Sequence, residues 1–234
     1  MIDFIKGLFF VRKCLVCGEV LPDAKKDTAF CPKCLLEYEK LERAHCPTCG
    51  RAEKSCGCVP ELLWGELSFS THLFAYESDL SKRVIFSLKR KNLSTLQNFL
   101  AYALARRLSA YELSGYTVTY VPRKPKSVRE YGFDQAEILA ALLADALSLP
   151  MADVFSHARF SALQKELNEK ERMENAEKSY SLCRGFERKT DKLLILDDVM
   201  TTGSTAKALV SLARSAGYRE VAFVTAAMTH KKRI

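Results

Sequence analysis

One run of thirteen residues carries the strongest structural signal in the chain: Leu193-Leu-Ile-Leu-Asp197-Asp198-Val-Met-Thr201-Thr202-Gly203-Ser204-Thr205. Its wholly apolar start is typical of a strand buried on both faces of a parallel sheet. Two adjacent carboxylates follow, and a loop rich in hydroxyl groups then opens a helix predicted over 204–216. Gly217 is well placed to end that helix. The run therefore predicts a strand–loop–helix unit of an α/β domain.

The start of the predicted helix has the properties of a phosphate site. Backbone N–H groups at a helix N-terminus lack partners within the helix, and the helix dipole favours an anion there. Five residues add hydroxyl donors or allow close approach of the backbone, namely Thr201, Thr202, Gly203, Ser204 and Thr205. Open α/β sheets bind ligands at the carboxyl ends of their strands. The run contains neither a Walker Gly-Lys-Ser/Thr nor a G-x-G-x-x-G fingerprint, so another phosphate ligand is predicted.

Asp197 and Asp198 would repel a phosphate and are expected to bind another part of the ligand. Adjacent carboxylates at a strand end can accept hydrogen bonds from a vicinal diol, such as that of a ribose. The alternative is that both are turn residues and that Thr202 or Ser204 is an ordinary helix cap. Two carboxylates directly after an apolar strand are costly without partners, which favours the ligand site.

Residues 61–234 alternate between β-like and helical segments, as expected for an α/β domain. Strands are predicted over 67–76, 116–121, 192–199 and 220–228, and helices over 80–88, 94–108 and 133–147. A basic loop is predicted after the strand at 116–121. Residues 165–178 are nearly all polar or charged and indicate an exposed helix or a mobile flap.

Residues 1–60 read as a cysteine-rich module with no long periodic segment. Eight of the nine cysteines lie here in four close pairs: Cys14-x-x-Cys17, Cys31-x-x-Cys34, Cys46-x-x-Cys49 and Cys56-x-Cys58. Such pairs direct two sulfurs at one tetrahedral centre, so the four pairs predict two structural zinc sites. Sequential assignment of the pairs makes a double zinc ribbon, and an interleaved cross-brace remains open.

Disulfides and a redox-active pair are the alternatives to zinc. A disulfide scaffold normally occupies a whole short secreted chain, whereas these cysteines crowd into one quarter of a longer one. His45 is a candidate substitute ligand for the weaker Cys56-x-Cys58 pair, although a surface histidine is the simpler interpretation.

The composition is that of an ordinary globular protein, with 48% apolar and 27% charged residues among 234. This excludes disordered and collagen-like classes. The apolar runs fall short of the roughly 18 residues that a membrane span needs. Lys6 interrupts the apolar start, which makes a poor signal peptide. A cytoplasmic protein without membrane insertion is expected.

The formal net charge of +8 permits nucleic-acid binding without demanding it, since zinc-bound thiolates would offset part of it. One basic cluster follows the strand at 116–121 and comprises Arg123, Lys124, Lys126 and Arg129. It is expected to bind a pyrophosphate with Mg²⁺ bridging the phosphates, or else to be a solvated loop. A second cluster near Phe86 and Tyr76 comprises Lys82, Arg83, Lys89, Arg90 and Lys91. It suits contact with single-stranded nucleic acid, while an amphipathic surface helix is the alternative.

The run Leu193–Thr205 resembles the phosphoribosyl-pyrophosphate (PRPP) motif of the type I phosphoribosyltransferases. The resemblance implies that Asp197 and Asp198 hold the ribose hydroxyls and that residues 201–205 cradle the 5′-phosphate. Thr201 stands where the oxopurine salvage enzymes carry an Asp base, which argues against that activity.

The whole chain resembles the ComF family, in which a zinc-ribbon module precedes a phosphoribosyltransferase domain. The further matches are Val121-Pro122, Gly132-Phe133-Asp134-Gln135, Gln164-Lys165, Arg172 and Asn175. The family usually reads Arg-Gly-Phe-Asn-Gln where this chain reads Tyr131-Gly132-Phe133-Asp134-Gln135, so a weaker pyrophosphate contact is expected there. The fold implied is a double zinc ribbon over 1–60, followed over 61–234 by a mainly parallel sheet with helices on both faces.

The function implied by the resemblance is that of a ComF-type PRPP-binding protein in DNA uptake during natural transformation, contacting single-stranded DNA. An active phosphoribosyltransferase of nucleotide metabolism, displacing pyrophosphate from PRPP, is the alternative. A third hypothesis is an interaction module whose zinc ribbons dock a helicase-like competence protein. The four scattered histidines form no constellation with a nucleophile, so no catalytic residue is assigned.

Overall fold

The computed structural model describes residues 13–21, 29–43, 46, 49, 51, 56–157 and 179–230. Four parallel strands form its main sheet in the order β1-β6-β5-β2. Their bounds are β1 (Ser70–Ala75), β2 (Tyr116–Tyr120), β5 (Lys192–Met200) and β6 (Glu220–Met228). The mainly parallel sheet predicted from the sequence is therefore confirmed.

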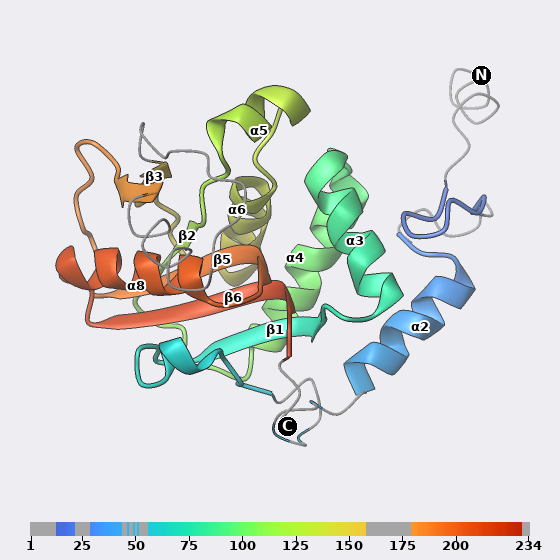
Figure 1. Ribbon diagram of the computed structural model, residues 1–234, viewed down its shortest axis with the longest axis horizontal. Helices are drawn as coiled ribbons and strands as arrows, with labels where there is room; N and C mark the ends of the chain where they lie inside the picture. Colours follow the sequence, from blue (N-terminus) through green and yellow to red (C-terminus); the bar gives the residue numbers. More distant parts are fainter. Residues whose placement is uncertain are drawn as a thin grey trace.

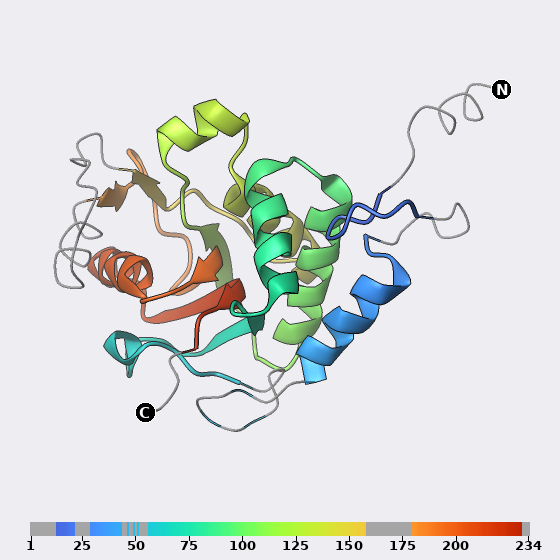
Figure 2. The same ribbon diagram turned by 45° about the vertical axis from the view of Figure 1, so that its right-hand side comes forward.

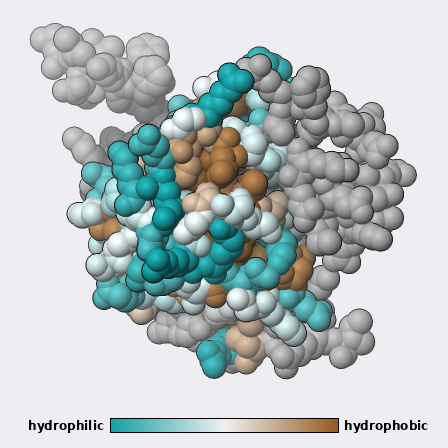
Figure 3. All heavy atoms as spheres, turned by 90° about the vertical axis from the view of Figure 1, so that its left-hand side faces the viewer, coloured by the Kyte–Doolittle hydropathy of each residue, from teal (hydrophilic) through white to brown (hydrophobic). Residues whose placement is uncertain are grey.

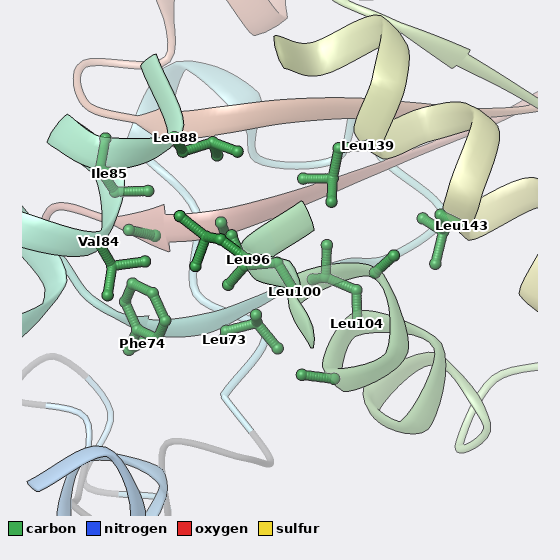
Figure 4. Packing of buried hydrophobic residues seen from close by; sticks show 14 of the residues in the cluster. Leu73, Phe74, Val84, Ile85, Leu88, Leu96, Leu100, Leu104, Leu139 and Leu143 are labelled. Carbon is green, nitrogen blue, oxygen red and sulfur yellow. The ribbon is translucent and has the colours of Figure 1, made fainter. Parts of the chain in front are cut away.

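Helices cover both faces of this sheet (Figures 1 and 2). One face carries α3 (Asp79–Arg90), α4 (Ser94–Leu108) and α6 (Gln135–Leu147), and the other carries α8 (Ser204–Ser215) and the short 3₁₀ helix η2 (Glu61–Leu63). Successive side chains of β5 point to opposite faces. Leu194 and Leu196 accordingly join the core beneath α3, α4 and α6, which Figure 4 shows from close by. Leu193 and Ile195 join the core beneath α8.

β5 extends beyond the end of its neighbour β2. The last residue pair between them is Tyr120 with Leu196, whereas β5 continues beside β6 as far as Met200. Asp197 and Asp198 are therefore strand residues, placed just where β2 has ended. Because all four strands are parallel, their carboxyl ends and the segments that follow them lie at this same edge.

In the described residues, two α-helices occur where the sequence predicted none. α2 (Pro32–Arg43) lies within the cysteine-rich module, and its apolar residues Leu35, Tyr38 and Leu41 pack on the main core. The cysteine pattern, which indicates metal ligands, hides the helical spacing of these residues. α5 (Pro125–Tyr131) replaces the predicted basic loop. Pro125 occupies its first turn, where the missing N–H costs nothing, but α5 buries no residue fully and so has no apolar periodicity to detect.

The cysteine-rich module shares a core with the α/β domain. The ring of Phe30 lies 4.7 Å from that of Phe99 in α4, and the ring of Tyr38 lies 5.1 Å from the same side chain. Tyr38 also meets Phe74 of β1 edge to face at 6.2 Å. Such aromatic pairs add to the area buried, so they join the module firmly to the domain.

A separate antiparallel pair consists of β3 (Phe155–His157) and β4 (Tyr180–Leu182). The predicted flap at 165–178, the family matches Gln164-Lys165, Arg172 and Asn175, and His45 all fall outside the described residues. In the described part of the chain, no helix combines the length and apolar character needed to cross a bilayer. Hydrophilic residues cover much of the face in Figure 3, around a smaller hydrophobic patch.

Candidate functional site

Asp198 points to the face of β5 that α3 and α6 cover, and it is almost fully buried. Lys89 Nζ, in the last turn of α3, lies 3.0 Å from Asp198 Oδ1. Gln135 Nε2, at the start of α6, donates a hydrogen bond to Asp198 Oδ2 at 2.6 Å. Two elements far apart in the chain thus supply the partners that a buried carboxylate requires. Sequence reasoning did not predict either contact.

Asp197 points to the opposite side of β5. It borders a cavity of about 40 Å³, together with Val199, Met200, Phe223 and residues 201–206. Asp197 Oδ1 accepts the backbone N–H of Asp198 at 2.7 Å. Burial, and then the negative charge of Asp198, raise the pKa of Asp197 well above its usual value. The two carboxylates therefore flank the strand end from either side, and only Asp197 lies beside the loop.

Gly203 is required for two reasons at the start of α8. Its φ is +82°, in the left-handed region that favours glycine. A Cβ there would also approach Pro60 Cβ and Cγ to 3.1 Å and Leu63 Cδ1 to 3.2 Å. The segment that leaves the last cysteine pair therefore packs directly on the predicted phosphate loop.

Hydroxyl groups surround this helix start. Thr202 Oγ1 and Ser204 Oγ lie 3.0 Å apart, and the side chain of Thr205 lies near that of Tyr180 of β4. Since Gly203 occupies the N-cap position, it brings no side chain of its own to the first amides of α8. These amides and hydroxyls form a concave set of donors, which is the arrangement that binds a phosphate.

Arg123, the first residue of the basic cluster after β2, connects the end of α3 with the start of α6. Its backbone N–H donates to Asp134 Oδ2 at 2.6 Å, and its guanidinium donates to the carbonyl of Lys89 at 2.8 Å. The guanidinium also lies 4.5 Å above the ring of Tyr131. The other three residues of the cluster are exposed on or beside α5: Lys124, Lys126 and Arg129. Pyrophosphate binding by the four residues stays a prediction.

The motif Gly132–Gln135 is a turn that carries Gln135 to Asp198. Gly132, with φ +80°, ends α5. Asp134 caps α6, its Oδ1 accepting the N–H of Ala136 at 2.9 Å. Asp134 thus occupies a position where its charge favours the N-terminus of a helix.

The second basic cluster is divided among several surroundings. Lys89 pairs with Asp198 at the strand end. The Arg90 guanidinium lies 4.5 Å above the ring of Phe86, and Lys91 borders a groove together with Lys82 and Arg83. Nucleic-acid binding by Lys89, Arg90 and Lys91 stays a prediction.

Eight of the nine cysteines form two groups of four, and within each group the sulfur atoms all lie within 4.8 Å of one another. One group is Cys14, Cys17, Cys31 and Cys34, and the other is Cys46, Cys49, Cys56 and Cys58. The sulfurs of Cys17 and Cys31 are 3.7 Å apart. A tetrahedron with Zn–S bonds of about 2.3 Å has edges of about 3.8 Å, whereas a disulfide bond is about 2.05 Å long. The donor sets fit zinc, and the assignment is sequential rather than interleaved.

Local structure explains how the first group assembles, and burial affects the thiols of both groups. Gly18, with φ +77°, turns the chain back after the first pair, and Cys31 and Cys34 lie at the start of α2. Burial raises the pKa of Cys34 and of Cys56, and raises that of Cys58 to about 11. Thiolates at these positions therefore need a cation beside them, which a metal ion supplies.

A histidine from the C-terminal end contacts the second cysteine group. His230 Nδ1 lies 3.5 Å from Cys46 Sγ, and its ring meets that of His72 on β1 at 5.1 Å. No constellation of the four histidines with a nucleophile was predicted from the sequence, and nothing in their spacing pointed to this contact. His230 links the end of the α/β domain to the module.

Two curated proteins resemble the chain along nearly its whole length. It is 24% identical over 221 residues to competence protein ComFC of Streptococcus pneumoniae, covering 89% of this chain and 96% of that protein. It is 25% identical over 228 residues to competence protein F of Haemophilus influenzae, covering 91% and 95% respectively. The predicted resemblance to the ComF family is thereby confirmed. No protein-family model matches the chain.

Several solved structures are similar in part. Glutamine PRPP amidotransferase from B. subtilis matches with a TM-score of 0.42 and 20% identity over 61% of this chain and 30% of that one. The purine phosphoribosyltransferase of Pyrococcus horikoshii matches with a TM-score of 0.37 and 18% identity over 60% of this chain and 79% of that one.

Proposed function

We propose that the chain is a ComF-type protein that binds PRPP with Mg²⁺ at the carboxyl end of β5 and serves DNA uptake in natural transformation. The observation that carries this proposal is the placement of Asp197 beside the glycine loop and the N-terminus of α8. A set of phosphate donors and a diol acceptor thus stand next to each other, which is what a phosphorylated ribose requires.

Each part of PRPP has a chemically suitable place. The 5′-phosphate would accept hydrogen bonds from the first amides of α8 and from the hydroxyls of residues 201–205. The ribose hydroxyls would donate to the carboxylates of Asp197 and Asp198. The pyrophosphate would extend toward the segment after β2, because β2 neighbours β5 and carries Arg123 beyond its end. Mg²⁺ would neutralise charge between the phosphates.

The Lys89–Asp198 ion pair supports a binding role for this edge. In the folded chain the cation balances a carboxylate that is otherwise almost fully buried. A ribose hydroxyl would take over one oxygen of that carboxylate, which would release Lys89 toward a phosphate of the same ligand. The competence role is proposed from the names of the two relatives, and the transforming DNA strand is the partner that it implies.

Calorimetry with PRPP and Mg²⁺ tests the proposal. Asp198→Asn keeps the size of the side chain and one acceptor for Gln135 but removes the charge. Asp191→Asn is its matched control, because Asp191 precedes the opposite end of the same strand and pairs there with Arg219. We expect Asp198→Asn to weaken binding by about tenfold or more, the usual cost of a lost charged hydrogen bond. Wild-type heats in this variant would refute the sugar-binding role.

Pyrophosphate release in the same solutions distinguishes binding from transfer. Release that depends on an added nucleobase or amine would favour the alternative of an active phosphoribosyltransferase. Binding without release is the result expected for the proposed function.

A further inference from the structure

A groove of about 790 Å³ lies between the first cysteine group and α3, apart from the residues assigned to PRPP. One wall consists of the turn from Lys13 to Gly18 with Leu21 and Ala29, and the other consists of α3 residues with the segment that follows them. A volume of this size is typical of pockets that enclose most of a ligand. The groove exists only because the module and the domain face each other.

Hydrogen bonds hold the two walls in place. Ser87 Oγ of α3 donates to the carbonyl of Leu15 in the cysteine turn at 3.2 Å. Leu15 N–H donates in turn to the carbonyl of Ala29 at 3.0 Å. The position of the cysteine turn, and with it the shape of the groove, therefore depends on the first metal site.

Positive side chains predominate in the groove, against a net charge of about −2 that a zinc ion with four thiolates would place beside Cys14 and Cys17. The described lining residues of the groove include four cations and no carboxylate, the cations being Lys13, Lys82, Arg83 and Lys91. Like charges gathered in a concave surface reinforce one another and attract a polyanion. The apolar residues between them are Leu15, Val16, Leu21, Phe86 and Leu93. A ligand that suits this lining has both repeated negative charges and flat apolar surfaces.

Phe86 supplies an accessible aromatic face. It lines the groove and keeps 53% of its surface exposed, an unusual state for such a large apolar side chain. Arg90 lies over its ring. Aromatic rings beside arginines are the platforms on which the bases of single strands stack. In a duplex the base faces are covered by one another, so Phe86 favours a single strand.

We propose that this groove binds a short stretch of single-stranded nucleic acid, with phosphates along the four cations and a base against Phe86. The inference rests on the proposed function, which implies a single DNA strand as the partner. It assigns that strand to residues that differ from those of the PRPP site. The residues assigned are Lys13, Lys82, Arg83, Phe86 and Lys91.

Fluorescence anisotropy with a labelled oligothymidylate and the zinc-loaded full chain tests the assignment. Lys82→Gln/Arg83→Gln removes two cations of the groove. Arg184→Gln/Lys189→Gln removes two exposed cations from the connection that leads into β5 and serves as the matched control. Each lost phosphate contact lowers the salt slope by about 0.7, so the first variant should lose about 1.4 in slope and bind about 25-fold less tightly at 0.1 M salt. The control should bind like the wild type.

Phe86→Ala tests the stacking contact independently. We expect at least about fivefold weaker binding with an unchanged salt slope. Trp64→Ala removes another exposed aromatic residue, directly after η2, and should have no effect. The inference is overturned if the groove variants keep wild-type affinity, if the wild type does not bind the strand, or if a duplex of equal length binds more tightly. PRPP heats measured on the same variants should stay at the wild-type value, so a failure of the PRPP site is recognised separately.

Discussion

The strand-end site and the groove beside the first cysteine group differ in how the chain builds them. Most of the polar groups of the strand-end site come from a single run, residues 197–205, whose amides, hydroxyls and carboxylates are local in sequence. The groove combines residues 13–29 with residues 82–95. A sequence motif can therefore predict the strand-end site, whereas the groove forms only when the cysteine-rich module packs against the α/β domain. We therefore expect a substitution in the cysteine-rich module and one in residues 197–205 to affect ligand binding at different sites.

The largest effect is expected from losing one metal site. Zinc-finger peptides gain about 10–16 kcal/mol from zinc at pH 7, so the turn carrying Cys17 should lose its shape in Cys17→Ser. We expect the zinc content to fall from two ions per chain to one and strand binding to disappear, while PRPP heats persist. Cys49→Ser loses the other ion and is the matched control, because it leaves the groove wall intact. Equal loss of strand binding in both variants would contradict the separation of the two regions.

Gly203→Ala should damage the strand-end site alone. A positive φ costs a non-glycine residue about 1–2 kcal/mol, and the new methyl group would meet Pro60 and Leu63, which adds about 1–3 kcal/mol of overpacking. Gly185→Ala is the control, because Gly185 has φ +71° but no atom within 4 Å of a new Cβ.

Chemical denaturation of the two glycine variants measures the difference. The excess loss in Gly203→Ala is the cost of the contact between the module's exit segment and the phosphate loop. Equal losses of stability in the two variants would mean that the loop accommodates the new methyl group without cost. The proposed link between the last cysteine pair and the PRPP site would then be wrong.

Lys89→Met tests the contact between α3 and the strand-end site. Removing the cation leaves the buried Asp198 with the hydrogen bond from Gln135, and we expect about 1–3 kcal/mol lower stability. Lys207→Met breaks the pair between Lys207 and Glu66, whose carboxylate is 36% exposed against 6% for that of Asp198, and should cost at most about 1 kcal/mol. Denaturation midpoints compare the two variants, and a smaller loss in Lys89→Met would contradict the assigned pairing.

The smallest expected effect is a gain in stability rather than a loss. Burial and the charge of Asp198 raise the pKa of Asp197 in the folded chain above its value in the unfolded chain. At pH values between these two pKa values, the unfolded state therefore binds fewer protons than the folded state. Stability therefore falls as pH rises through that interval. Asp197→Asn removes the penalty, and we expect its melting temperature at pH 7 to exceed that of the wild type by a few degrees, about 2–4 °C per kcal/mol.

The gain in Asp197→Asn should shrink below about pH 4, where the carboxyl group is protonated in both states. Thermal melts at several pH values measure it, with Asp191→Asn as the exposed control. A lower melting temperature of Asp197→Asn at pH 7 would show instead that the Asp197 carboxylate stabilises the ligand-free protein.

The fold was largely predictable because its signals are local. β6 and α4 match their predicted ranges, and β5 ends at Met200 rather than at Val199. Strands buried on both faces read as continuous apolar runs, and amphipathic helices carry a periodicity of about 3.6 residues. α5 was missed because it buries no residue fully, and α2 because cysteines masked its apolar face. At the site, Asp197 and the glycine loop were recognised from one run of sequence. The contacts of Asp198 with Lys89 and Gln135 could not be, because they join residues more than sixty positions apart.

A crystal structure of the complex with PRPP and Mg²⁺ tests the proposed sugar–phosphate site most directly. We predict the 5′-phosphate against the amides of residues 203–205 and the ribose hydroxyls on Asp197 and Asp198, with Lys89 drawn away from Asp198. A ligand bound elsewhere, or an unaltered Lys89–Asp198 pair beside an empty loop at saturating PRPP, would contradict that site.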